Sequence, residues 1–116
     1  MTGADCLFCK IVERRIPAEI IHEDPAVVIF KDIHPQAPVH YLCVPRRHLS
    51  GPVDLTQDNA DVTGAVFAAA ARAAERAGLT GAGYRLVVNQ GRDGGQTVEH
   101  LHVHLLGGRS MSWPPG

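Results

Sequence analysis

The chain has 116 residues, which is enough for one compact domain and too few for two ordinary ones. Hydrophobic residues make up 45% and charged residues 20%, so wholesale disorder is excluded. Eleven Lys and Arg against twelve Asp and Glu give a formal charge of -1, which removes the electrostatic case for a nucleic-acid coat or an anionic membrane patch.

The start of the chain carries no targeting pattern. Residues 1–5 lack the basic start and apolar stretch of a secretory signal. No later run approaches the roughly twenty apolar residues of a membrane span. We therefore expect a cytoplasmic protein whose partners include no nucleic acid and no membrane.

A short helix is predicted next, over residues 6–15. Leu7, Ile11 and Val12 recur there at helical spacing. Pro17 is expected to end this helix, because the residue before a proline disfavours helical geometry.

The middle of the chain alternates strand and helix patterns. Two apolar runs, residues 27–30 and 39–44, predict strands, and the proline-broken stretch between them predicts a loop. Residues 56–77 are rich in alanine, and their apolar side chains recur at intervals of three and four. This pattern predicts the one long helix, with Gly78 as its C-terminal stop.

The last third predicts a strand over residues 84–89, a glycine-rich turn over residues 91–95 and a final strand over residues 99–106. Strands therefore precede and follow one helix. That arrangement predicts an α+β fold with an antiparallel sheet rather than a parallel doubly wound one.

The three cysteines cannot form a closed disulfide framework. Cys6 and Cys9 make a C-x-x-C pair, which favours metal ligation or redox chemistry in a chain without a secretory signal. Two reduced, partly buried cysteines without metal are the plain alternative, and no βαβ unit follows to support a thioredoxin-like role. Cys43 lies in an apolar run and is expected to be a small core residue.

The final predicted strand carries histidines at alternate positions. Side chains alternate between faces along a strand, so His100, His102 and His104 are expected to share one face. Two residues advance a strand by roughly 6.6 Å, so the three rings would form a row. The aliphatic residues between them are expected to pack against the long helix.

Residue types alone leave three interpretations of this row. It could be a solvent-facing strand on which histidine merely occurs, although the alternation with aliphatic residues argues against that. It could be a metal site, which would need ligands from neighbouring strands. It could be catalytic, because a neutral imidazole with one nitrogen held by a backbone carbonyl can attack phosphorus with the other.

A phosphate would find suitable groups just before the histidines. The glycines of residues 91–95 let the backbone approach an anion closely, and Asn89, Gln96 and Thr97 carry neutral donors. No Walker-type Lys-Ser/Thr pattern is present. The sequence thus favours a phosphate mono- or diester over a magnesium-bound triphosphate.

Residues 89–104, from Asn89 through the Gly-rich turn to the three histidines, resemble the signature of the histidine triad (HIT) superfamily. The ending, residues 106–116 with its terminal Trp-Pro-Pro-Gly, resembles the Hint branch, the nucleoside phosphoramidate hydrolases. Residues 30–38 and 44–48 match further motifs in family order. The resemblance covers nearly the whole chain, and the N-terminal C-x-x-C is similar to that of bacterial relatives.

This resemblance implies a single HIT domain over residues 1–116, with a five-stranded antiparallel sheet, one long helix and a short N-terminal helix. It implies a homodimer that joins the two sheets, with the tail of residues 107–116 contributing to the dimer and the active site. The implied activity is hydrolysis of the P–N bond in purine nucleoside 5'-phosphoramidates, such as adenosine phosphoramidate or AMP-lysine. A covalent nucleotidyl-histidine would form, and nucleoside monophosphate and amine would be released without a catalytic cofactor.

The resemblance also implies roles for single residues. His102 would be the nucleophile, with His104 and Thr97 on the phosphate oxygens, and Thr97 keeps the hydroxyl of the serine usual in Hint proteins. His40 and His100 would support the catalytic row. The other implied nucleotide-binding residues are Phe30, Asp32, Ile33, Asn89, Gly95, Gln96, Val98 and Trp113, of which Trp113 would reach towards the partner subunit's site.

In bacterial relatives the C-x-x-C pair looks like half of a zinc site that two histidines complete. The matching ligand set in this chain is Cys6, Cys9, His48 and His100, which suits tetrahedral zinc. All four positions would be filled by protein, so the implied zinc is structural and would pin the N-terminal segment to the sheet.

Other functions stay open beside this one. A nucleotide-binding adaptor dimer would bind tightly and hydrolyse only incidentally, and a metal-dependent enzyme would use the histidine strand directly. Other branches of the superfamily hydrolyse dinucleoside polyphosphates or transfer nucleotides. The ending with Trp113 and the third histidine, His104, argue against those branches, because transferases usually have glutamine at that third position.

Overall fold

Helices and strands are described for residues 5–116 of the chain, in a computed structural model. In chain order they are α1 (Leu7–Val12), β1 (Ile20–Glu23), β2 (Val27–Lys31), β3 (Val39–Pro45), η2 (Pro52–Asp54), η3 (Gln57–Asn59), α2 (Ala60–Arg76), β4 (Tyr84–Val87) and β5 (Val103–Gly107), where η marks a 3-10 helix. The expectation of no secretory signal in residues 1–5 falls almost wholly outside the described residues.

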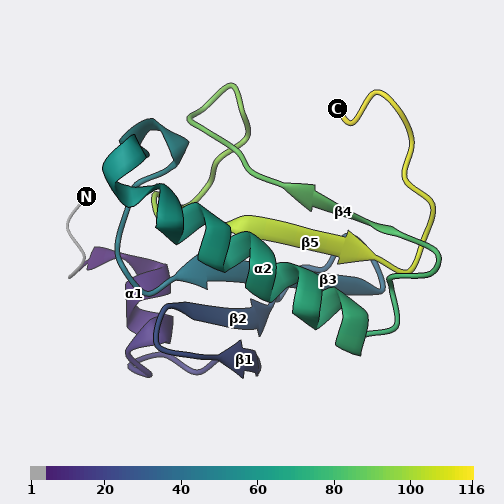
Figure 1. Ribbon diagram of the computed structural model, residues 1–116, viewed down its shortest axis with the longest axis horizontal. Helices are drawn as coiled ribbons and strands as arrows, with labels where there is room; N and C mark the ends of the chain where they lie inside the picture. The colour runs from purple at the N-terminus through teal and green to yellow at the C-terminus, as the bar shows by residue number, and fades with distance from the viewer. Residues whose placement is uncertain (1–4) are drawn as a thin grey trace.

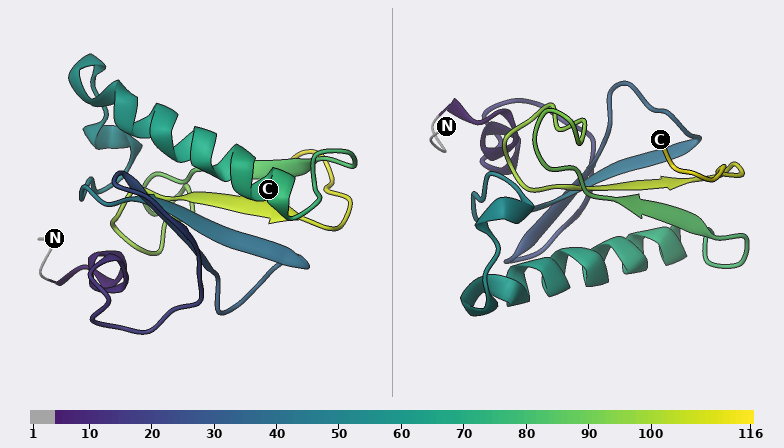
Figure 2. Two further views of the ribbon diagram at one scale, coloured as in Figure 1. Left: turned by 60° about the horizontal axis from the view of Figure 1, so that its bottom comes forward. Right: turned by 90° about the horizontal axis from the view of Figure 1, so that it is seen from above.

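The five strands form one antiparallel sheet in the order β1-β2-β3-β5-β4 (Figure 1). The long helix α2 lies across one face, and the short helix α1 lies on the opposite face, as both views of Figure 2 show. The expected α+β fold, with a five-stranded antiparallel sheet, one long helix and a short N-terminal helix, is therefore confirmed.

Small residues on α2 let the helix lie close to the sheet. Val66, Ala70 and Ala73 are almost fully buried there and share a core cluster with Val103 and Leu105 of β5. The aliphatic face of the last strand thus packs against the long helix, as expected. The histidine side of that strand therefore lies on the other face of the sheet.

The opposite face has its own core. Phe8 and Ile11 of α1 pack against Val28, Phe30 and Leu42 of the central strands. Because both faces are covered, β2 and β3 are buried on both sides and appear in the sequence as continuous apolar runs.

Both helices differ at their ends from the predicted spans. The prediction of a helix through residue 15 is wrong, because α1 ends at Val12 and Arg14 adopts a left-handed backbone with φ 60°. The long helix begins at Ala60, later than expected, because Thr56 and Asn59 form a capping box around the 3-10 turn η3. Gly78, with φ 77°, follows the helix end as predicted.

The strands differ more. The residues of β1 show no apolar alternation, so no sequence pattern predicted this strand. Only the family resemblance implied that the sheet has a fifth strand. β4 ends at Val87, two residues before the predicted end. The last strand does not begin at residue 99: residues 98–100 are a bend, and β5 begins at Val103.

The late start of β5 corrects the expected row of three histidines. Only His104 lies on β5, and the backbone that carries His100 is fixed instead by a hydrogen bond from the Leu101 N–H to the Leu49 carbonyl, 2.6 Å long. The His100 ring is fully buried (0% exposed) and faces the Cys6 side chain, whereas His102 and His104 lie side by side. No helix within residues 5–116 is long and apolar enough to cross a membrane.

Candidate active site and metal cluster

A cavity of about 310 Å³ opens on the sheet face that α1 covers. Residues named from the sequence make up much of its wall. Those that line it are Phe30, Asp32, Ile33, Thr97, Val98, His102 and His104. This volume lies at the lower end of the range for typical ligand cavities, and it is large enough for a nucleotide-sized ligand.

One hydrogen bond orients the His102 ring. Its Nδ1 lies 2.6 Å from the His100 carbonyl oxygen, so Nδ1 carries the proton and donates it. The Nε2 atom of the neutral ring then keeps its lone pair. Burial lowers the pKa of His102 below its usual value, against the hydrogen bond to the His100 carbonyl and the charge of Asp32, so the nucleophilic neutral form persists into mildly acidic solution.

A second chain of hydrogen bonds orients His104. The Gln36 N–H donates to His40 Nδ1 over 3.0 Å, so the proton of neutral His40 is on Nε2. That Nε2 lies 2.9 Å from His104 Nδ1, which must accept and leave the His104 proton on its own Nε2. His104 therefore offers an N–H donor next to the His102 lone pair, with the two ring centroids 4.9 Å apart.

Asp32 lies at the junction of these histidines. Its Oδ2 is 3.5 Å from His40 Nε2, and its Oδ1 accepts the His34 N–H over 2.8 Å. Asp32, His40 and His104 are close enough together to hold a metal ion. The hydrogen bond from Gln36 argues against metal there, because His40 would have to lose both ring protons.

The glycine-rich turn is held by the side chain of Gln96. Its Oε1 accepts the Gly91 N–H over 2.8 Å, and its Nε2 donates to the Ser50 carbonyl over 2.7 Å and to the Val98 carbonyl over 3.0 Å. The side-chain amide of Gln96 is thus engaged in hydrogen bonds within the protein. The sequence predicted that Gln96 contacts the ligand, whereas in the structure its side chain holds the turn.

The remaining predicted residues lie off the cavity wall. Asn89 lies beside Gly95, whose φ of 83° belongs to a left-handed turn. Neither residue lines the cavity. Trp113 is 83% exposed in the tail, which Arg85 holds through a hydrogen bond to the Ser112 carbonyl. Within this chain, Trp113 contributes nothing to the described cavity wall.

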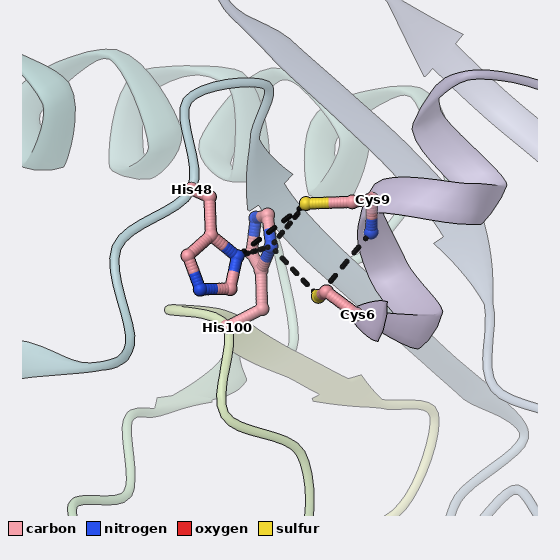
Figure 3. Close-up of side chains that lie close together, drawn as sticks. All are labelled: Cys6, Cys9, His48 and His100. Atoms are coloured by element: carbon pink, nitrogen blue, oxygen red, sulfur yellow. Dashed lines mark hydrogen bonds between the residues drawn. The ribbon is translucent and has the colours of Figure 1, made fainter. Parts of the chain in front are cut away.

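The four predicted metal ligands come together at the start of α1 (Figure 3). His100 Nδ1 lies 3.3 Å from Cys6 Sγ, 3.5 Å from Cys9 Sγ and 3.1 Å from His48 Nδ1. Cys9 Sγ is 3.4 Å from His48 Nδ1. Zn–S bonds of about 2.3 Å and Zn–N bonds of about 2.0 Å place tetrahedral ligands roughly 3.3–3.8 Å apart, close to this arrangement.

The chemistry of the cluster also fits a cation. His100 Nε2 donates to the Pro45 carbonyl over 2.8 Å, so His100 Nδ1 presents a lone pair to the sulfur atoms and to His48. Burial, and then the neighbouring Cys6, raises the pKa of the Cys9 thiol to about 11. Zinc would supply the charge that stabilises the thiolates, and the cluster could therefore hold this ion.

Residues of α1 complete the cavity wall in a way the sequence did not indicate. Leu7, Phe8 and Ile11 line the cavity. The helical pattern marked Leu7 and Ile11 only as apolar, and Phe8 belonged to no motif. Their spacing predicts a buried helix face, and nothing in the sequence states that this face meets a ligand cavity.

Comparison with known families gives one match that spans most of the chain. The HIT domain family matches residues 13–111. Among curated proteins, an uncharacterized HIT-like protein of Synechococcus elongatus is 46% identical over 112 residues, which are 97% of each chain.

Solved structures agree with this match. A HIT family hydrolase from Legionella pneumophila superposes with a TM-score of 0.95 at 46% identity, covering 97% of this chain and 100% of that one. A HIT family hydrolase from Clostridium thermocellum gives a TM-score of 0.91 at 44% identity, covering 93% of this chain and 94% of that one.

Proposed function

The chain belongs to the HIT domain family, and on that premise we propose that it is a hydrolase of purine nucleoside 5'-phosphoramidates. The observation that carries the proposal is the hydrogen bond from His102 Nδ1 to the His100 carbonyl, because it leaves the Nε2 lone pair of a cavity-lining histidine free. Adenosine phosphoramidate and AMP-lysine are the substrates that we propose. The two solved relatives, from Legionella pneumophila and Clostridium thermocellum, are HIT family hydrolases, which supports the reaction class.

The composition of the cavity supports a nucleoside ligand. Its apolar wall, with Phe30 and Ile33 on one side and α1 on the other, suits a purine base. The Asp32 carboxylate can accept hydrogen bonds from ribose hydroxyls. Thr97 and Val98 follow the glycine-rich turn and place a hydroxyl and backbone groups near the two histidines, where the phosphate would lie.

The proposed reaction proceeds in two displacements at phosphorus. His102 Nε2 attacks, a bond from Nε2 to phosphorus forms, and the P–N bond to the amine breaks; the amine takes that electron pair and a proton from water. Water then attacks the phosphorus of the nucleotidyl-histidine, loses a proton, and releases nucleoside monophosphate and the free His102 ring. A covalent intermediate of this kind replaces one difficult displacement by two easier ones.

His104 stabilises the charge that develops on the phosphoryl oxygens. Its Nε2–H is fixed as a donor by the hydrogen bond from His40, so no reorganisation is needed when the transition state forms. Donors held in this way contribute about 2.7–4 kcal/mol each in acyl-transfer enzymes. In this proposal His40 acts on the reaction through His104, without touching the substrate.

Zinc would be held by Cys6, Cys9, His48 and His100, at the start of α1. All four positions of the ion would be filled by protein, so it would supply structure rather than a reactive water. The zinc-bound His100 would keep its backbone carbonyl in place for His102 Nδ1.

We also propose a homodimer. β4 is an edge strand of the sheet, and its outer side has no described partner strand within the chain. An edge strand presents unpaired backbone N–H and C=O groups, which can pair with a strand of a second chain. The exposed Trp113 side chain (83%) lies in the tail that the β4 residue Arg85 anchors, so the same contact would cover it.

Replacement of His102 tests the mechanism. His102→Ala is expected to abolish hydrolysis of a fluorogenic adenosine phosphoramidate while AMP still binds, because the variant loses the attacking nitrogen and keeps the rest of the cavity. Mass spectrometry of wild-type protein mixed briefly with substrate should show a nucleotidyl adduct on His102.

His22→Ala is the matched control, because His22 lies outside the cavity wall and bonds to Asp24. Its turnover should equal that of the wild type. Undiminished turnover in His102→Ala would refute the mechanism. Tight AMP binding with no turnover of any phosphoramidate by the wild type would favour the adaptor function instead.

A further inference from the structure

The short helix α1 takes part in two sites at once. Its N-cap residue Cys6 and its internal residue Cys9 belong to the metal cluster. Leu7, Phe8 and Ile11, interleaved with these cysteines, line the nucleotide cavity. The same short helix therefore carries two of the metal ligands and part of the cavity wall.

Phe8 touches the machinery of both sites. Its ring lies edge-on to His100, at a centroid distance of 6.1 Å, and to His102, at 5.1 Å and an interplanar angle of 88°. A third edge contact, at 5.3 Å, joins it to Phe30 in the cavity wall. Any displacement of α1 must therefore change the surroundings of the nucleophile and of the base pocket together.

The local structure of α1 is weak, so its position depends on the packing of Phe8 and Ile11 against the sheet and on the contacts of Cys6 and Cys9 in the cluster. The helix has only six residues, and isolated helices shorter than about 12–15 residues are marginal in water. Its N-cap hydrogen bond runs from the Cys9 N–H to Cys6 Sγ over 3.4 Å and uses a weak acceptor. A tetrahedral ion would tie α1 to His48 and His100, which lie 39 and 91 residues away from Cys9 in the sequence.

We propose that metal binding at the Cys/His cluster and nucleotide binding in the cavity are energetically coupled through α1, with Phe8 as the positioning residue that transmits the coupling. The ion fixes α1 in the arrangement that closes the cavity wall, so the metal-bound protein binds nucleotide more tightly. The proposal rests on the proposed function only for the identity of the ligand, a purine nucleoside monophosphate.

Coupling of this kind is reciprocal. If zinc raises the affinity for nucleotide by some factor, nucleotide must raise the affinity for zinc by the same factor. When the metal-free protein has a closed wall only part of the time, its apparent nucleotide affinity falls by that fraction. The effect needs no contact between the two ligands.

The test uses AMP, which has no amine leaving group and therefore binds without turnover. Calorimetry of AMP binding to zinc-loaded and chelator-stripped protein gives the factor by which zinc raises the affinity for AMP. Competition for zinc with a chromophoric chelator, with and without saturating AMP, gives the factor by which AMP raises the affinity for zinc. We expect both factors to agree and to lie between about 5 and 150, the usual range of coupling between sites.

Two variants locate the coupling. Phe8→Leu keeps an apolar residue on α1 and removes the ring contacts to His100 and His102, so the factor should fall towards one. Ile33→Ala is the matched control: Ile33 lines the cavity from a loop outside α1, so AMP binding should weaken while the factor stays at the wild-type value.

Each other outcome overturns a distinct statement. An AMP affinity that is equal with and without zinc refutes the coupling and leaves the hydrolase proposal intact. Protein that binds no AMP in either form refutes the nucleotide site, and the coupling with it. Loss of the whole circular dichroism spectrum on zinc removal would show metal-dependent folding of the entire chain, which contradicts a role confined to α1.

Discussion

At the scale of single residues, one hydrogen bond decides what each histidine of the site can do. The His100 carbonyl fixes the proton of His102 on Nδ1, and the Gln36 N–H fixes that of His40 on Nε2. The tautomer of His104 follows from His40. Two neighbouring imidazoles thereby present opposite groups at Nε2, a free lone pair on His102 and an N–H donor on His104.

The titration of His104 gives a prediction at this scale. Burial, and then the charges of His102 and His40, lowers its pKa to about 4 from an ordinary value of 6.5. The unfolded chain therefore binds a proton before the folded chain does, and stability is lost as the pH falls from about 6.5 to about 4, by at most about 1.4 kcal/mol for each pH unit.

His104→Gln removes this titration. As the pH is lowered through that window, we expect the free energy of unfolding of the wild type to fall more than that of His104→Gln. Urea denaturation of both proteins at constant zinc measures this difference. Contributions from the metal cluster cancel, because both proteins carry it. A difference that does not change with pH would contradict the buried neutral ring.

At the scale of elements, the glycine-rich turn shows how close packing positions a loop of the candidate site. A Cβ on Gly94 would lie 2.4 Å from the Gln90 carbonyl oxygen, so the turn closes too tightly for any other residue. The same turn is tied to Ser50 through Gln96. These contacts set the position at which Thr97 enters the cavity.

Gly94→Ala is therefore expected to destabilise the protein by about 1–3 kcal/mol, the usual cost of forcing atoms into a packed site. It should also reduce kcat/KM, because the turn carries Thr97 towards the phosphate. Chemical denaturation and initial-rate kinetics provide the measurements. Gly81→Ala is the control, since a Cβ there meets nothing within 4 Å, and it should leave both quantities near the wild-type values.

At the scale of the whole molecule, the two faces of the sheet differ: one carries the long helix and its packed core, and the other carries the short helix that takes part in both candidate sites. α2 covers one face and α1 lies on the other (Figure 2). Residues of α1 line the cavity and belong to the cysteine–histidine cluster. The edge strand β4 borders both faces. A second copy paired along β4 would extend the sheet across both chains.

Light scattering on purified protein checks this assembly. We expect the mass of two chains, because the outer side of β4 would otherwise expose unpaired backbone groups. Arg85→Ala removes the bond that holds the tail to β4 and should weaken the dimer, seen as a mass that falls on dilution. A mass of one chain at every concentration would contradict the homodimer.

The sequence predicted the elements with strong local patterns and failed where local pattern was weak. The alanine spacing of α2 and the apolar runs of β2 and β3 gave the correct element types, because burial of a helix stripe or of a whole strand leaves a direct pattern. β1 has no such pattern, and its place depends on pairing with β2. The predicted start of β5 was wrong, because a backbone hydrogen bond to Leu49 interrupts the segment that carries the histidines.

The C-x-x-C spacing and the three alternating histidines by themselves indicated residues of both candidate sites, since that depends on residue type and short-range spacing. The residue pattern left open how the histidines divide between two sites; the family resemblance implied a division, and only the tertiary structure shows the contacts that make it. His100 turns to Cys6 across 94 residues of sequence, while His102 and His104 face the cavity. Such long-range contacts arise from the packing of the whole chain, and no local pattern encodes them.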